Sequence, residues 1–149
     1  PSDKPWEGGG VSYSLVTRDS DRYRMWYRCD PWGRGEEYKE YNAVTAYAES
    51  DDGIHWIKPD LGIVELRGSK HNNAIFPSIP VYPFGPFIDA NPTVHPEQRY
   101  KAVARHVGGS LRHLMAYASS DGINCQGTWC FTQLLKLGIY ITGFTVALL

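Results

Sequence analysis

The chain has 149 residues, of which 42% are hydrophobic, and a formal charge of -1 at pH 7. This length allows one domain with a modest core, and the balanced charge excludes the strongly basic surface that attracts nucleic acids or anionic membranes. The 15 Gly and 10 Pro residues argue against long helices and favour frequent turns. The composition therefore predicts a turn-rich domain with no nucleic-acid partner and no clear membrane span.

The cysteines and histidines show no spacing that is typical of a metal site. Cys29, Cys125 and Cys130 are an odd set, and the five His residues are dispersed along the chain. We expect buried thiols or at most one disulfide, and no metal. The chain begins at Pro1 with no leader, which indicates a processed chain or a fragment.

Short strands account for most of the sequence in chain order. Alternating or β-rich patterns predict strands over residues 11–18, 22–28, 43–50, 62–66, 99–106 and 111–120. Asp-Ser-Asp at 19–21 predicts a hairpin turn between the first two strands, and residues 68–73 carry turn chemistry. The polar segment 31–42 predicts an exposed loop. Four prolines in residues 76–87 exclude a helix or a central strand, so we expect an aromatic-rich connector.

Residues 126–149 differ in character from the preceding chain, because their last sixteen positions carry Lys136 as the only charge. This apolar run is shorter than the roughly 20 residues that a membrane-spanning helix needs. A buried strand pair is one interpretation, and an out-of-frame or otherwise non-native tail is the other, which we favour. We therefore divide the chain into residues 1–125 and an atypical tail over 126–149.

Two parts of the sequence repeat the same order of motifs. An Arg-Tyr strand, a loop, an Ala-Tyr-Ala strand and a Ser-x-Asp-Gly-Ile turn occur twice. The Arg-Tyr strands begin at Arg22 and Arg99, and the turns begin at Ser50 and Ser119, so the spacing from strand to turn is shorter in the second copy. Two units with one internal change of length explain this pattern.

The turn motif has a local physical explanation. In an Asp-Gly turn, Gly accepts a positive φ and Asp bonds nearby backbone N–H groups, while the preceding Ser can cap the same turn. Trp56 is expected to fold over this turn and pack against the neighbouring unit. Cys125 replaces it in the second copy, where Trp129 could substitute. We predict a structural role, without substrate contact, for Ser50, Asp52, Gly53 and Trp56.

Repeated four-stranded antiparallel units of this length, rich in turns and aromatics, are typical of a β-propeller. Two units would leave open sheet edges and would not close a ring. The predicted fold is therefore all-β, with residues 1–125 forming two blades of a partial propeller.

Two segments carry a resemblance to a known family: SDDGIHWIKPDLG (50–62) and PFIDANPTVHPEQRYKAVAR (86–105). Together they resemble the five-bladed propeller glycoside hydrolases, above all the amino-terminal domain of family 32, and more distantly family 43. The resemblance covers roughly residues 5–125. It implies a five-bladed parent, a carbohydrate partner, no required cofactor, and the extracellular or periplasmic placement usual in the family.

The resemblance also implies catalytic carboxylates: an Asp nucleophile, an Asp in an Arg-Asp-Pro motif that stabilises the transition state, and a Glu as general acid/base. Asp89 corresponds to the stabilising Asp, although Ile88 and Ala90 stand where the family has Arg and Pro. Glu7 is the only carboxylate near the nucleophile's expected place, without the family's Asp-Pro-Asn-Gly motif. The third-blade Glu has no counterpart. Trp6 and Asn91 are candidates for substrate binding.

Each candidate has a structural alternative: a turn cap for Asp89, a solvated loop residue for Glu7 and core packing for Trp6. The expected function is that of a fragment of a glycoside hydrolase-like propeller, whose parent cleaves a glycosidic bond and which alone is inactive. A non-catalytic carbohydrate-binding or protein-interaction propeller is the alternative. An edge-exposed β-fragment with no function of its own is the third interpretation.

Overall fold

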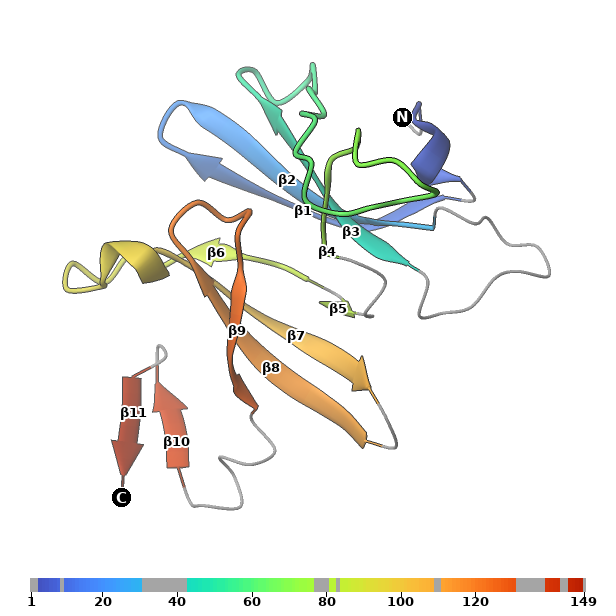
Figure 1. The fold of residues 1–149 in the computed structure, drawn as a ribbon. Coiled ribbons are helices and arrows are strands. Elements are labelled where there is room, and N and C mark those ends of the chain that lie inside the picture. Colours follow the sequence, from blue (N-terminus) through green and yellow to red (C-terminus); the bar gives the residue numbers. More distant parts are fainter. Residues whose placement is uncertain are drawn as a thin grey trace.

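The computed structural model describes residues 3–8, 10–30, 43–76, 81–82, 84–108, 111–130, 139–142 and 145–148. These ranges form an all-β structure of antiparallel sheets, as the sequence predicts (Figure 1). Their only helical segments are two 3-10 helices, Pro5–Glu7 and Pro96–Gln98. No helix in this described part is long and apolar enough to cross a membrane. The predicted loop at 31–42 lies outside the described residues.

The first sheet has four antiparallel strands that pair in chain order. They are β1 (Val11–Asp19), β2 (Arg22–Cys29), β3 (Val44–Ser50) and β4 (Ala74–Phe76). Asp19 pairs with Arg22, which confirms the hairpin turn predicted between the first two strands.

The second sheet repeats this arrangement with an interrupted first strand. Its strands are β5 (Val81–Tyr82), β6 (Phe87–Ile88), β7 (Tyr100–Gly108), β8 (Leu111–Ser119) and β9 (Gln126–Cys130). β5 and β6 both pair with β7, at different places along it. The proline-rich connector thus contributes two short edge strands, the position in a sheet that proline tolerates.

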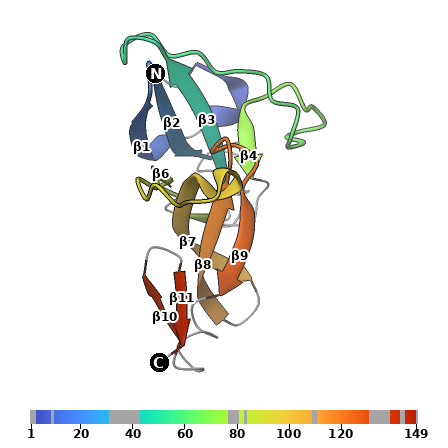
Figure 2. The same cartoon turned by 90° about the vertical axis from the view of Figure 1, so that its left-hand side faces the viewer.

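The second sheet extends past the predicted boundary at residue 125, because β9 pairs with β8. The rest of the predicted tail contains β10 (Ile139–Thr142) and β11 (Thr145–Leu148), which pair only with each other among the described strands. Figure 2 shows this hairpin at the carboxyl-terminal end of the chain. The described part of the predicted tail thus consists of strands, β9 in the second sheet and β10 and β11 in a hairpin of their own.

The two sheets have the same register, which gives the sequence repeat a structural basis. Tyr23 pairs with Ser50 in the first sheet, and Tyr100 pairs with Ser119 in the second. Each of these partners occupies the same place in its own copy of the repeated motifs. The units therefore differ in the length of the connection between their second and third strands, and equivalent positions can be assigned residue by residue.

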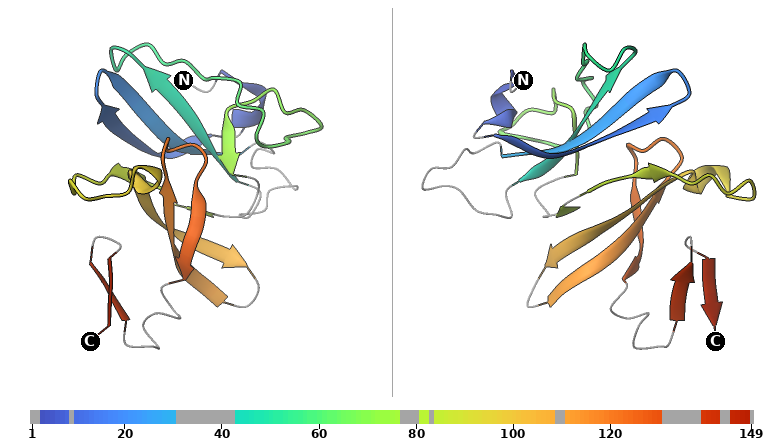
Figure 3. Two further views of the ribbon diagram at one scale, coloured as in Figure 1. Left: turned by 60° about the vertical axis from the view of Figure 1, so that its left-hand side comes forward. Right: turned by 180° about the vertical axis from the view of Figure 1, so that it is seen from behind.

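The sheets stack face to face around an aromatic cluster (Figures 1 and 3). The ring of Trp26 lies 5.7 Å from that of Tyr47 in its own sheet and 6.1 Å from that of Tyr100 in the other, measured between centroids. Burial of such large rings supplies much of the stabilisation of a small domain. The fully buried or nearly buried members are Trp26, Tyr47, Ile75, Phe84, Tyr100, Ala102, Ala104 and Tyr117.

The other face of the first sheet carries a second cluster, formed by Tyr27, Cys29, Val44, Ala46, Ala48, Val64, Leu66 and Ala74. Two of these residues, Val64 and Leu66, belong to the connection between β3 and β4. The predicted strand at 62–66 is wrong, since only an isolated bridge from Leu66 to Ser69 forms there. The expected packing of Trp56 also needs correction: it contacts this cluster of its own unit rather than the neighbouring sheet.

Candidate functional site

The first turn motif forms a closed set of local hydrogen bonds. The Ser50 Oγ accepts the N–H of Gly53 at 2.9 Å. The Asp52 Oδ1 accepts the N–H groups of Ile54 and His55, each at 2.8 Å. Together with the His55 ring, these donors hold the pKa of Asp52 well below its usual range. The predicted cap and Asp-Gly turn are thus both present, with Gly53 at a φ of 77°.

The second turn reproduces these bonds and also joins the two sheets. The Ser119 Oγ accepts the N–H of Gly122 at 3.0 Å, as Ser50 does for Gly53. The indole N–H of Trp26 donates to the carbonyl oxygen of Gly122 at 2.7 Å, and Arg24 donates to that of Asp121 at 2.9 Å. The turn of one unit therefore docks on the second strand of the unit before it.

A buried carboxylate, Asp19, ends β1 beside the second sheet. Arg24 Nε lies 3.1 Å from its Oδ2, and Arg99 Nη1 donates to the same oxygen at 3.1 Å. The Tyr100 hydroxyl also contacts it. The bonds from Arg99, followed by that from Tyr100, outweigh burial and lower the pKa of Asp19 to about 2. Asp19 is therefore ionised at neutral pH and links the sheets electrostatically.

Asp89 has a similar environment at the end of β6. Its Oδ2 lies 2.5 Å from the Nζ of Lys101, a side chain only 5% exposed, and its Oδ1 accepts the N–H of Asn91 at 2.9 Å. The Lys101 ammonium lowers the pKa of Asp89. The Asp89 N–H donates to the carbonyl of Arg99, so Arg99 contacts both carboxylate residues.

Asp19 and Asp89 occupy equivalent positions in the two sheets. Asp19 is the last residue of β1 and Asp89 directly follows β6, and each forms an ion pair with a basic residue at the same place on the second strand, Arg24 or Lys101. Asp19 is not among the candidates identified from the sequence, although aligning the two repeated units would have placed it opposite Asp89. Asp19 follows Arg18 as Asp89 follows Ile88, so the first unit has the Arg-Asp pair that the second lacks.

We predict that Asp19→Asn destabilises the chain in a pH-dependent way. A pKa of about 2, against 3.8 for the unperturbed group, corresponds to about 2 kcal/mol of stability. Because this pKa is depressed on folding, the contribution is present above about pH 4 and is lost as the pH falls to about 2. Urea unfolding measured from pH 7 to pH 2 should show that the difference in unfolding free energy between wild type and variant decreases on acidification. The exposed Asp21→Asn serves as control, and a pH-independent difference would contradict the ion pair.

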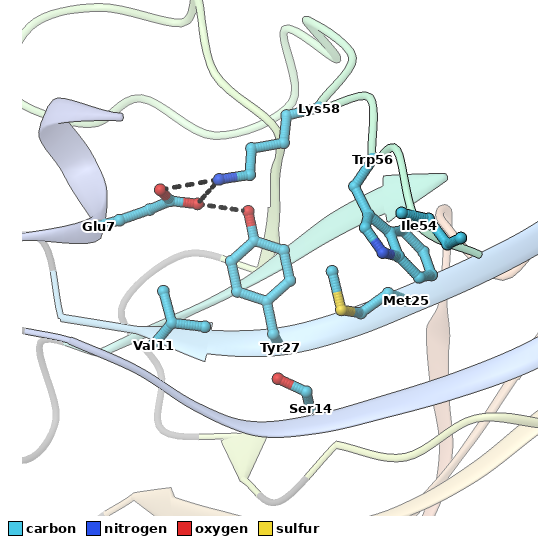
Figure 4. A pocket seen from close by; sticks show the side chains of 8 residues that line it. All are labelled: Glu7, Val11, Ser14, Met25, Tyr27, Ile54, Trp56 and Lys58. Atoms are coloured by element: carbon cyan, nitrogen blue, oxygen red, sulfur yellow. Dashed lines mark hydrogen bonds and ion pairs between the residues drawn. The ribbon is translucent and has the colours of Figure 1, made fainter. Parts of the chain in front are cut away.

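Glu7 lies in a different place, on the 3-10 helix Pro5–Glu7, with its side chain fully buried (Figure 4). Its Oε1 accepts the Tyr27 hydroxyl at 2.7 Å and lies 2.6 Å from the Nζ of Lys58. Its Oε2 accepts the backbone N–H groups of Asp3 and Lys4 at 2.9 and 3.0 Å. Burial alone would raise the pKa of Glu7, but the hydrogen bonds from Lys58, Tyr27 and the backbone outweigh it and lower this pKa.

A pocket of about 410 Å³ opens beside this ion pair (Figure 4). Apolar side chains and a few polar groups line it together, a combination common in binding pockets. It is lined by Glu7, Val11, Ser14, Met25, Tyr27, Ile54, Trp56 and Lys58.

The structure does not bring Glu7 and Asp89 together. Glu7 lies where β1 begins, since Gly8 bridges to Asp30 after β2, whereas Asp89 lies near Asp19, where β1 ends. A strand of this length spans roughly 25 Å. Paired glycosidase carboxylates stand about 5 to 9.5 Å apart, so these two residues do not form such a pair.

The predicted substrate contacts are also separated. The Trp6 indole N–H donates to the Asn73 Oδ1 at 2.7 Å, and the ring packs against the second cluster, as its core-packing alternative describes. Asn91 is exposed beside Asp89, with its Oδ1 accepting the N–H of Thr93 at 3.0 Å. Of the predicted residues, only Asn91 accompanies Asp89.

The described residues contain no group of His, Cys, Asp or Glu side chains that could hold a metal ion. Cys29 and Cys125 are free thiols in this part of the chain. Burial raises the pKa of Cys29 above its usual range and that of Cys125 to about 12. Neither thiol is therefore activated as a nucleophile.

Comparison with known proteins places this chain near two relatives from Mycobacterium tuberculosis. They are the uncharacterized protein Rv1502 of strain ATCC 25618 / H37Rv and the uncharacterized protein MT1551 of strain CDC 1551 / Oshkosh. Each is 39% identical over 70 residues, which is 46% of this chain and 23% of the relative. The chain thus spans about a quarter of the length of the curated relatives it matches. No family model matches the chain, and no solved structure does.

Proposed function

We propose that the two stacked sheets are neighbouring blades of a β-propeller related to the glycoside hydrolases. Their common strand order and register support this proposal. So does the closeness of their first strands: the Thr17 hydroxyl donates to the carbonyl of Pro86 at 3.4 Å, and Leu15 lies against Gly85. In a propeller, blades of this kind surround a central channel.

The proposed activity, in a longer protein, is cleavage of a glycosidic bond. The observation that carries it is the equivalence of Asp19 and Asp89, two ion-paired carboxylates on adjacent blades. Glycoside cleavage passes through an oxocarbenium-like transition state, which ionised carboxylates stabilise. Since both pKa values are lowered, Asp19 and Asp89 suit a nucleophile or a charge-stabilising role. A general acid needs a raised pKa, so it would come from another part of such a protein.

The second candidate is a propeller that binds carbohydrate without cleaving it. It is favoured by the cationic partners that both carboxylates already have, Arg99 and Lys101. Ile88 and Ala90, which replace the family's Arg and Pro, favour it as well.

Ligand binding by the chain distinguishes these candidates without requiring turnover. We predict that a cationic iminosugar binds at least about tenfold more tightly than the neutral sugar of the same configuration, because a hydrolase site favours the charge of its transition state. Isothermal titration of a panel of such pairs measures this preference. Asp19→Asn and Asp89→Asn should each abolish it, and the exposed Asp60→Asn should not.

Equal affinity for both members of a pair, unchanged in these variants, would support the non-catalytic binder. If no sugar of either kind bound, neither candidate would stand for this chain.

A further inference from the structure

At the interface between the two sheets, a side chain of the first sheet packs into a site on the second sheet. Trp26 of the first sheet meets a surface of the second sheet that includes Tyr100 and Ala102 on β7, with Ile123 and Cys125 after β8. The carbonyl of the adjoining turn accepts the indole N–H. The second sheet thus provides a seat for a large side chain of the sheet before it.

The first sheet carries the same seat on its opposite face, where no other described sheet covers it. By the register of the repeat, Met25 is equivalent to Ala102, and Ile54 and Trp56 are equivalent to Ile123 and Cys125. Met25, Ile54 and Trp56 all line the pocket of about 410 Å³ (Figure 4). Ile54 is 75% exposed at its rim. Three of the four positions equivalent to the Trp26 seat therefore line this pocket, whereas Tyr23, the counterpart of Tyr100, is not among its lining residues.

The outer face of the second sheet carries the counterpart of Trp26. This residue is Val103, which is 40% exposed, and Leu114 on the same face is 51% exposed. Side chains alternate along a strand, so Val103 points away from Ala102 and the first sheet. The two exposed faces consequently lie at opposite ends of the stack.

The two exposed faces also complement each other in size. Val103 is smaller than Trp26, whose place it takes. The pocket walls Met25 and Trp56 are correspondingly larger than Ala102 and Cys125, the residues of the occupied seat. The smaller Val103 would thus pack against larger lining residues, so that the total side-chain volume at the contact stays similar to that at the Trp26 seat.

We propose that this pocket receives the Val103–Leu114 face of a second copy of the chain. Such docking would continue, between molecules, the sheet-on-sheet interface already present within each molecule. The contact is heterologous, because two different surfaces meet head to tail. It would cover apolar side chains that are otherwise exposed at both ends of the stack.

Sedimentation velocity across a concentration series tests the proposal. We expect the wild-type chain to self-associate reversibly. Ile54→Asp at the pocket rim and Leu114→Glu on the opposite face should each weaken association about tenfold or more, since a charge is then placed in an apolar contact. Both side chains are exposed, so both variants should fold, which circular dichroism checks. Ile63→Asp, outside the pocket lining, is the matched control.

Mixing the two variants gives the decisive result. Ile54→Asp keeps an intact Val103–Leu114 face and Leu114→Glu keeps an intact pocket, so an equimolar mixture should form a one-to-one dimer. The proposal is overturned if the wild-type chain stays monomeric at all accessible concentrations. A mixture that stays monomeric, or association that Ile54→Asp and Leu114→Glu leave unchanged, would overturn it too.

Discussion

Gly122→Ala is expected to lower the free energy of unfolding by about 3 kcal/mol, whereas Gly53→Ala should lower it by about 1 kcal/mol. Both glycines have a positive φ, 73° and 77°, so Ala is strained by a similar amount at either position. The difference comes from packing. A Cβ on Gly122 would lie 2.8 Å from Trp26 Cζ2 and 3.0 Å from Tyr100 Cδ1, but on Gly53 its nearest neighbour, Tyr23, is 3.6 Å away.

Urea denaturation of the two variants measures this difference directly, provided that the dependence of unfolding free energy on denaturant is the same for both. Gly53→Ala is a closely matched control, because it changes the same residue type in the same turn. Equal losses would mean that Trp26 does not pack tightly on the second turn, and would contradict the stacked arrangement of the sheets.

The repeated units could be predicted from the sequence because their signals are local. Strand alternation and the Ser-x-Asp-Gly turn depend on neighbouring residues, so the hairpin at Asp19–Arg22 and the turns at Ser50 and Ser119 agree with expectation. The strand expected at 62–66 fails for a related reason. Apolar residues at alternate positions there pack onto the sheet as part of a loop, and no neighbouring strand pairs with them among the described residues.

The candidate site is less predictable because it depends on contacts between distant residues. Nothing near Glu7 in the sequence indicates that Lys58 neutralises it or that β1 separates it from Asp89. The local sequence pattern indicates only that Asp19 lies at a turn. Its ion-pair partner Arg99 lies far along the chain, so local pattern does not reveal it. Only the internal equivalence of the two units, applied position by position, relates Asp19 to Asp89 before the structure is known.

Lys58→Met is expected to lower the free energy of unfolding by about 3 to 5 kcal/mol, because it leaves a buried carboxylate without its cation. Glu7 is fully buried, the Lys58 side chain is 8% exposed, and their charged atoms are 2.6 Å apart. The same substitution at the exposed Lys70 should lower the free energy of unfolding only slightly. If Glu7→Gln is added to Lys58→Met, most of the lost stability should return, since the unpaired charge is then gone.

The pH dependence of this loss distinguishes charge from packing. In the wild type the pKa of Glu7 is lowered on folding, so its contribution is present above the unfolded value of about 4 and is lost on acidification. In Lys58→Met, burial is expected to raise the pKa of Glu7 instead, and protonation then favours the folded state as the pH falls. The difference in unfolding free energy between wild type and Lys58→Met should therefore decrease from pH 7 to pH 4. A constant difference would show that Lys58 contributes through its aliphatic chain rather than its charge.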